Sequence, residues 1–175
     1  MSLVINVLTY QIVWFLCVFM GNVGAFLSLL LLALHLFRSR FLREDLIMMF
    51  VLLLIGMVVD GAIRYGGFIS FTVDGFPIPF WLAVIWLALA ILPHHSLYWL
   101  KGRPLLSVLF AAVGGPLAYW AGVRFGSAEF NSPLLVSLAL LAVVWAVLWP
   151  LAMAVANYIL PRDRIDTVPS QTDSA

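Results

Sequence analysis

Six long apolar runs leave this chain few ways to fold. They cover about residues 3–21, 23–37, 46–64, 78–100, 104–124 and 134–158, and most approach the ~20 residues that an α-helix needs to cross a ~30 Å hydrocarbon core. Because lipid offers no hydrogen-bond partners, a backbone inside it must satisfy its own polar groups, which favours helices. We therefore expect an all-α polytopic membrane bundle with six transmembrane helices.

The composition excludes several other classes of protein. Of the 175 residues, 65% are apolar and 10% are charged, against roughly 25% charged residues in a soluble domain. A soluble fold with this composition would expose much apolar surface to water. We therefore exclude a soluble globule, a disordered chain and a nucleic-acid-binding protein, and expect the lipid bilayer to be the main partner.

The basic residues indicate how the bundle is oriented. Seven of the nine Lys and Arg residues fall in segments 38–43, 101–103 and 162–164, which share one side if six spans are correct. Arg64 and Arg124 fall on the other side. Since cytoplasmic loops carry an excess of basic residues, both termini are predicted to be cytoplasmic, in a multi-pass protein of the bacterial inner membrane.

The chain divides into a membrane domain and a tail. We expect residues 1–160 to form the six-helix transmembrane domain and the polar residues 161–175 to form a disordered cytoplasmic tail. The segment 21–24, with glycines at both ends, predicts a tight antiparallel hairpin of the first two spans. Glu44 and Asp45 open the third span, where acidic groups suit the positive helix end.

A first group of polar residues is predicted near the outer end of the bundle. Asp60 and Arg64 are spaced i, i+4, and Tyr119 and Arg124 of the fifth span reach a similar level. One interpretation is a pocket open to the periplasmic side, in which an arginine binds an anionic head group or carboxylate. The other is a structural ion pair with a snorkelling arginine. Gln11, near mid-membrane, is either an interhelical hydrogen-bonding group or a ligand-binding one.

A second group comprises all three histidines, near the inner end. His35 closes the second span, and His94 and His95 follow Pro93 in the fourth. His35 and one of the adjacent pair would suit a two-histidine haem site or a proton relay. The alternative is interfacial histidines that bond to backbone or head groups. The sequence indicates no metal and no other cofactor.

The fifth span contains Gly114-Gly115-Pro116. Small residues let helices approach closely, so we favour a packing role. The alternative is a broken helix whose freed backbone groups face a ligand. Trp81, Trp99 and Trp120 are predicted to lie near the membrane interfaces.

Two groups of residues carry a family resemblance. The first is Pro79-Phe80-Trp81, Trp86, His95-Ser96-Leu97 and Trp99, and the second is Gly114-Gly115-Pro116-Leu117-Ala118-Tyr119, Ala121-Gly122 and Arg124. Gln11, Trp14, Phe15 and Asp60 also fit. Over about residues 5–158 the chain resembles the bacterial inner-membrane family named domain of unknown function 2878 (DUF2878). His94 stands where that family tends to have Asn.

The resemblance implies a small multi-span protein without an established activity. Genes of this family often accompany genes that resemble cyclopropane-fatty-acid synthases and other lipid-modifying oxidoreductases. The implied partner is therefore a membrane or lipid-modifying protein.

Three functions follow as hypotheses. The first is a non-enzymatic accessory component in membrane-lipid modification or envelope homeostasis, with a basic surface at 38–43 and 101–103. The second is a small transporter or lipid-handling protein with an intramembrane polar pocket. The third is a membrane enzyme or haem protein that uses His95 with His35 or His94. The sequence leaves open whether the protein is an enzyme and favours a non-enzymatic role. The candidate substrate-binding residues are Gln11, Asp60, Arg64, His95, Tyr119 and Arg124.

Overall fold

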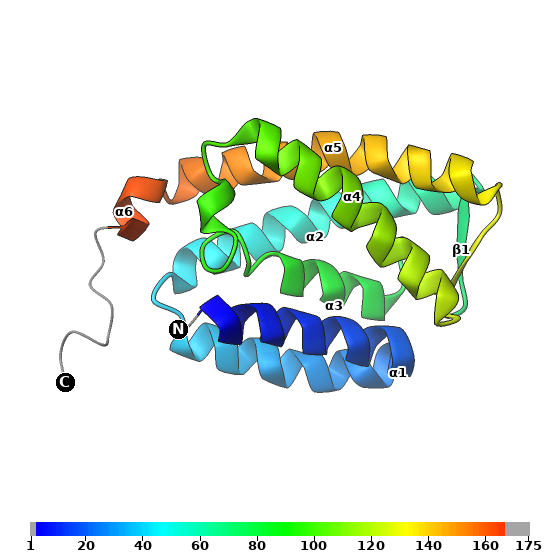
Figure 1. The fold of residues 1–175 in the computed structure, drawn as a ribbon. Coiled ribbons are helices and arrows are strands. Elements are labelled where there is room, and N and C mark those ends of the chain that lie inside the picture. The colour runs from blue at the N-terminus through cyan, green and yellow to red at the C-terminus, as the bar shows by residue number, and fades with distance from the viewer. Residues whose placement is uncertain (1–2, 167–175) are drawn as a thin grey trace.

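The computed structural model describes residues 3–166 as a bundle of helices packed side by side (Figure 1). The helices are α1 (Leu3–Arg38), α2 (Leu42–Tyr65), α3 (Phe80–Leu89), α4 (Pro104–Arg124), α5 (Leu134–Ile159) and α6 (Arg162–Asp166). Four of them, α1, α2, α4 and α5, are long and apolar enough to cross a membrane. The predicted all-helical class is confirmed.

Helix α1 is folded back on itself at Gly21. A straight helix of 36 residues would be about 54 Å long, but Gly21 has φ 55° and ψ −132°, a conformation open to glycine. Figure 1 shows the two arms lying side by side. A Cβ at Gly24 would overlap the Leu16 carbonyl of the other arm, and the Cys17 thiol donates to the Ser28 hydroxyl at 3.7 Å. The predicted tight hairpin is confirmed.

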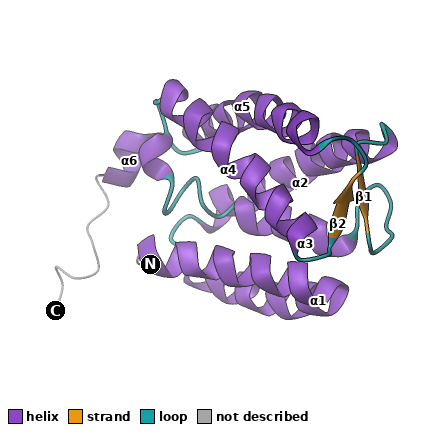
Figure 2. Cartoon of the chain, turned by 45° about the vertical axis from the view of Figure 1, so that its right-hand side comes forward, coloured by secondary structure: helices purple, strands orange, loops and turns teal. Residues whose placement is uncertain are grey.

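Two short strands join the loops at one end of the bundle (Figure 2). Strand β1 (Ile69–Phe71) follows α2, strand β2 (Ala128–Phe130) follows α4, and the two pair antiparallel. These strands were not predicted from the sequence, because a segment of three residues is too short to show an alternation of apolar and polar side chains. We name this end the strand end. The opposite end, where α1 begins and α6 lies, is named the histidine end.

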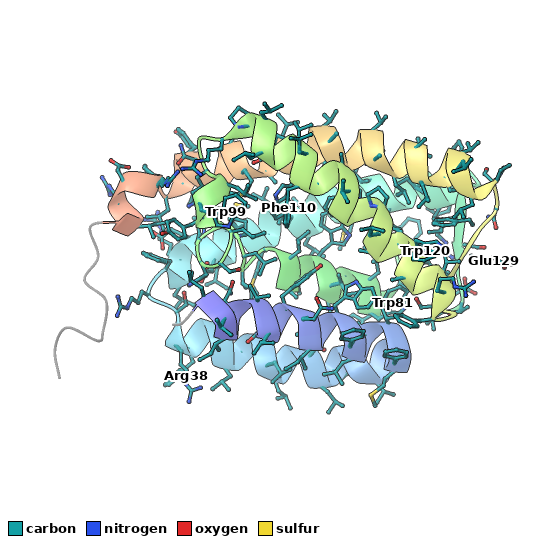
Figure 3. All side chains as sticks on the ribbon, in the orientation of Figure 1. Arg38, Trp81, Trp99, Phe110, Trp120 and Glu129 are labelled. Carbon is teal, nitrogen blue, oxygen red and sulfur yellow. The ribbon has the colours of Figure 1, made fainter. Side chains whose placement is uncertain are left out.

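Charged and aromatic residues mark both ends of the bundle. Figure 3 shows Arg38 and Trp99 at the histidine end, and Trp120 and Glu129 at the strand end. The basic segments 38–43, 101–103 and 162–164 connect or follow helices at the histidine end. The chain therefore gathers most of its positive charge at one end.

The predicted continuous helix over residues 78–100 is wrong. Helix α3 ends at Leu89, after about 15 Å of rise, and buried irregular chain follows it to the 3₁₀ helix Tyr98–Leu100. Pro93 explains the end point, because its ring would clash with the carbonyl of residue 89 in a continued helix and it has no N–H to donate there. The Leu89 carbonyl instead accepts from Leu92 N.

Asn6 of α1 satisfies the polar groups of this irregular chain. Its amide nitrogen donates to the Ile91 carbonyl at 3.2 Å, and its oxygen accepts from the backbone N–H of Ser96 at 3.1 Å and from the Ser96 hydroxyl. Irregular backbone at membrane depth is tolerated where protein groups replace the missing hydrogen bonds. Asn6 therefore fixes the shape of the segment that carries His94 and His95.

The beginning of the predicted tail contains α6, and residues 167–175 lie outside the described residues. Lys101 was expected to join an exposed basic surface, and this is wrong. Its side chain is fully buried, and its ammonium donates to the Leu160 carbonyl at 2.8 Å. Burial lowers the pKa of Lys101 to about 8. Lys101 therefore ties the start of α4 to the end of α5.

Four residues from four helices form a layered contact that we name the indole stack. The rings of Trp86 (α3) and Trp145 (α5) stack with centroids 5.4 Å apart and planes 7° apart. Gly56 of α2 lies against the Trp86 ring and Gly115 of α4 against the Trp145 ring, so closely that a Cβ at either glycine would overlap the indole. Helix α4 runs unbroken through Gly114-Gly115-Pro116, so the packing interpretation holds and the broken-helix alternative is wrong.

Adjacent glycines in α4 provide a matched test of this packing. We expect Gly115→Ala to destabilise the protein by about 1–3 kcal/mol, because the added methyl forces the Trp145 ring out of place. Gly114→Ala should be neutral or stabilising, since its Cβ would meet no atom within 4 Å and alanine favours helix. Thermal unfolding in detergent measures both. Equal melting temperatures for the two variants would contradict the stack.

Candidate functional site

A cavity of about 560 Å³ lies between the first arm of α1 and helices α3, α4 and α5. Its wall is almost entirely apolar and aromatic, and it contains no charged residue among those that the structure describes. Trp14, Trp81, Trp86, Trp145 and Trp149 all contribute to it. Its volume falls within the ~300–1,000 Å³ typical of small-molecule pockets.

The cavity opens sideways between α1 and α4. Helix α1 packs mainly against α3, and α4 mainly against α5. Lining residues from α1 and α4 are therefore partly exposed, with Phe15 at 41%, Phe110 at 46% and Leu117 at 53%. Toward the strand end the gap is closed by the rings of Phe19 and Phe125, whose centroids are 4.8 Å apart. The opening therefore lies on the side of the helix bundle, and not at either of the ends where the loops are.

A buried carboxylate stands behind the cavity wall. Asp60 of α2 is fully buried, and it accepts hydrogen bonds from Trp86 Nε1 at 2.7 Å and from the Tyr119 hydroxyl. Both donors line the cavity. Helix geometry places these groups near one another. Asp60 lies one turn after Gly56 in α2, and Tyr119 lies one turn after Gly115 in α4, so both are next to the stacked indole rings. The indole stack and this hydrogen-bonded carboxylate are therefore one unit.

Two indole nitrogens of residues in the wall have no hydrogen-bond acceptor within the described residues. They are the Nε1 atoms of Trp145 and Trp149, which both belong to residues that line the cavity. Buried N–H groups are nearly always paired. Both nitrogens expose almost no surface, so the cavity does not present either of them directly to a bound molecule.

The structure brings together part of the predicted outer group. Gln11 and Tyr119 both line the cavity, and Tyr119 bonds to Asp60. Arg64 does not pair with Asp60 as the structural alternative proposed. It donates to the Asp74 carboxylate at 2.9 Å and to the Gly75 carbonyl.

Arg124 and Arg64 are both absent from the cavity wall, among the residues described. Arg124 is exposed at the end of α4. The spacing of Asp60 and Arg64 was misleading because side chains from other parts of the fold compete for each of them. The sequence does not show where those competing partners lie.

The histidines form a separate cluster around Asp45. Its fully buried carboxylate lies 3.2 Å from His94 Nδ1, 2.9 Å from His95 Nε2 and 3.6 Å from His35 Nε2. The Ser39 hydroxyl donates to the same carboxylate. From the sequence, His35 and one of the adjacent pair His94 and His95 were predicted to approach each other, whereas Asp45 was assigned only to the positive end of its helix. Its position one loop after His35 was the signal that could have found it.

The cluster does not have the form of a two-histidine haem site. The rings of His35 and His95 have centroids 4.9 Å apart and are nearly perpendicular, at 82°, with the Asp45 carboxylate in contact with His95. Axial haem ligands lie on opposite faces of a porphyrin, and this separation leaves no space for one. The arrangement suits proton exchange or coordination of a small cation.

The four long apolar helices are those of a helical membrane protein. Within that class the chain belongs to the family described as Protein of unknown function (DUF2878), whose sequence model matches residues 3–151. The resemblance inferred from the sequence is therefore confirmed. No curated protein and no solved structure matches the chain.

The Asp60 hydrogen bonds can be tested with two tyrosines. We expect Tyr119→Phe to destabilise the protein by about 1–3 kcal/mol, because a buried carboxylate loses a donor. Tyr158→Phe is the matched control, since Tyr158 is 90% exposed on α5. Thermal unfolding in detergent measures the difference, and a Tyr119→Phe variant as stable as the control would show that Asp60 does not need this donor.

Proposed function

We propose that this protein is a multi-pass protein of the bacterial inner membrane that binds a lipid-like molecule in the cavity between α1 and α4. The proposed crossings are the two arms of α1, α2, α3 with the irregular chain behind it, α4, and α5. The gathering of basic segments at the histidine end supports placing that end, with both termini, in the cytoplasm.

Cysteine labelling tests this orientation. In a Cys17→Ala background, a membrane-impermeant maleimide added to intact cells should label Asp74→Cys and Glu129→Cys at the strand end, because these loops face the periplasm. Arg38→Cys should be labelled only after the cells are permeabilised. Labelling of Arg38→Cys in intact cells, or equal labelling of all three variants, would contradict the proposed orientation.

The observation that carries the binding proposal is the apolar, aromatic-lined cavity of about 560 Å³. An empty apolar space of this size is costly, because its lining loses packing contacts. Its sideways opening, between residues such as Phe15 and Leu117, suits a ligand that enters from the bilayer rather than from water. A hydrocarbon chain or a flat hydrophobic ring fits this wall.

The polar groups of the wall limit the ligand's chemistry. No charged side chain lines the cavity among the described residues, so an anionic head group would lie there unpaired at high cost. Gln11, whose amide can donate a hydrogen bond, provides a neutral hydrogen-bonding group. The proposed ligand is therefore a hydrophobic molecule with a neutral acceptor, such as an ester, ketone or hydroxyl oxygen.

Both of the non-enzymatic roles considered for this chain would use such a cavity. A lipid-handling protein or small transporter binds the molecule and releases it. An accessory component of membrane-lipid modification holds the molecule for a partner enzyme. The cavity favours lipid handling, since its wall is formed by described residues of this chain alone, without a partner protein. Copurification of a lipid-modifying enzyme in mild detergent is the result that would favour the accessory role.

Photocrosslinking tests the binding site directly. A C16 fatty-acid methyl ester with a terminal diazirine is added to the purified protein in detergent, and the crosslinked peptides are mapped by mass spectrometry. We expect crosslinks on the lining segments of α4 and α5. Ala118→Phe, which places a ring in the cavity wall, should reduce them at least about fivefold, equivalent to about 1 kcal/mol of binding free energy.

Val113→Phe is the matched control on the same helix. Val113 is 59% exposed and does not line the cavity, so its crosslinking should equal that of the unmodified chain. Crosslinks spread over the outer helix faces, with equal yields in both variants, would contradict binding in the cavity.

A further inference from the structure

The histidine cluster is separate from the cavity and is not used by the proposed lipid binding. Neither its carboxylate nor any of its three imidazoles lines the cavity. Its side chains come from three segments of the chain. His35 lies in the last turn of α1 and Asp45 in the first turn of α2, and His94 and His95 lie in the irregular segment that follows Pro93.

Burial makes the charge of this cluster expensive. Asp45 is fully buried, and His35 and His94 are 3% and 1% exposed. A buried carboxylate needs a positive partner or protonation. The partner is either an imidazolium among these histidines or a bound cation.

Several nitrogen atoms of the cluster lack hydrogen-bond partners within the described residues. Both nitrogens of His35 and the Nε2 of His94 are buried and unpaired. The Nε2 of His35 faces Asp45 Oδ2 at 3.6 Å, which is too long for a hydrogen bond. An imidazole nitrogen that has no hydrogen bond and faces a carboxylate is suitably placed to bind a metal ion beside that carboxylate.

Three residues of the cluster are spaced as metal ligands. One ring nitrogen each of His35 and His95 and a carboxylate oxygen of Asp45 all lie within 4.8 Å of one another. The two separations from Asp45 Oδ2 are 3.6 Å to His35 and 2.9 Å to His95. They bracket the ~3.4 Å edge of a tetrahedron with metal–ligand bonds of about 2.1 Å.

We propose that His35, Asp45 and His95 bind a divalent first-row transition-metal ion. Two imidazoles and one carboxylate form a nitrogen and oxygen ligand set that suits Zn²⁺, Fe²⁺ or Mn²⁺ and leaves a position open. His94 Nδ1 and the Ser39 hydroxyl contact the Asp45 carboxylate from outside this set. They orient the carboxylate, as the outer contacts of metal ligands commonly do.

Metal titration of the purified full chain tests the proposal. The protein is prepared without a polyhistidine tag, stripped with a chelator and kept in detergent. Co²⁺ is added while the visible ligand-field absorption is followed, and Zn²⁺ is then titrated against a chromophoric chelator. We expect one ion per chain and displacement of Co²⁺ by Zn²⁺.

Variants separate the ligands from their neighbours. Asp45→Asn and His35→Gln should each weaken Zn²⁺ binding by more than the ~10–100-fold that we expect for the outer contact His94→Gln. Glu44→Gln is the matched control, since it removes a carboxylate from the same turn of α2 without touching the proposed set. Circular dichroism and gel filtration establish that each variant is folded. His95→Gln provides a further test if Asp45→Asn does not fold.

The opposite results overturn the proposal. In the first, the folded chain takes up no stoichiometric Zn²⁺, Co²⁺, Mn²⁺ or Fe²⁺. In the second, the Asp45→Asn and His35→Gln variants bind the metal as strongly as the Glu44→Gln variant does. Either result would identify the cluster as a hydrogen-bonded histidine–aspartate network without a metal. Neither would bear on lipid binding, which the crosslinking experiment tests at a different site.

Discussion

Close packing of two indole rings between two glycines joins α2, α3, α4 and α5. Helices in lipid gain little from the hydrophobic effect on association, so contact area and interhelical hydrogen bonds must hold them together. The stack provides the contact area, and the bonds from Trp86 and Tyr119 to Asp60 provide the hydrogen bonds. Because Trp86 and Trp145 also line the cavity, the contact that holds the bundle together also shapes the cavity.

The shortness of α3 gives the two candidate sites their positions. Pro93 ends regular helix halfway along the bundle, and Asn6 then satisfies the irregular chain that follows. This chain carries His94 and His95 to Asp45 at the histidine end. An apolar cavity and a cluster of buried polar side chains are thereby separated along one short protein.

The sequence predicted the helical class and the first hairpin well and the polar partnerships poorly. Apolar run lengths gave the helical class, and the glycines at 21 and 24 gave the hairpin, since both depend on local chain properties. The pairing of Asp60 with Arg64 was a reasonable expectation for an isolated helix. In the bundle, Trp86 and Tyr119 reach Asp60 from other helices, and Arg64 turns to Asp74 in the following loop.

The sequence by itself determined which segments avoid water, which residues break helices, and at which end of the bundle the basic residues gather. These properties follow from side-chain transfer energies and backbone restrictions, which act locally. Tertiary structure alone decided that Asp45 meets three histidines, that Asp60 lies behind an aromatic wall, and that Lys101 is buried. Such contacts depend on how helices distant in sequence rotate and cross, because each side chain takes the best partner that the packed bundle brings within a few ångströms.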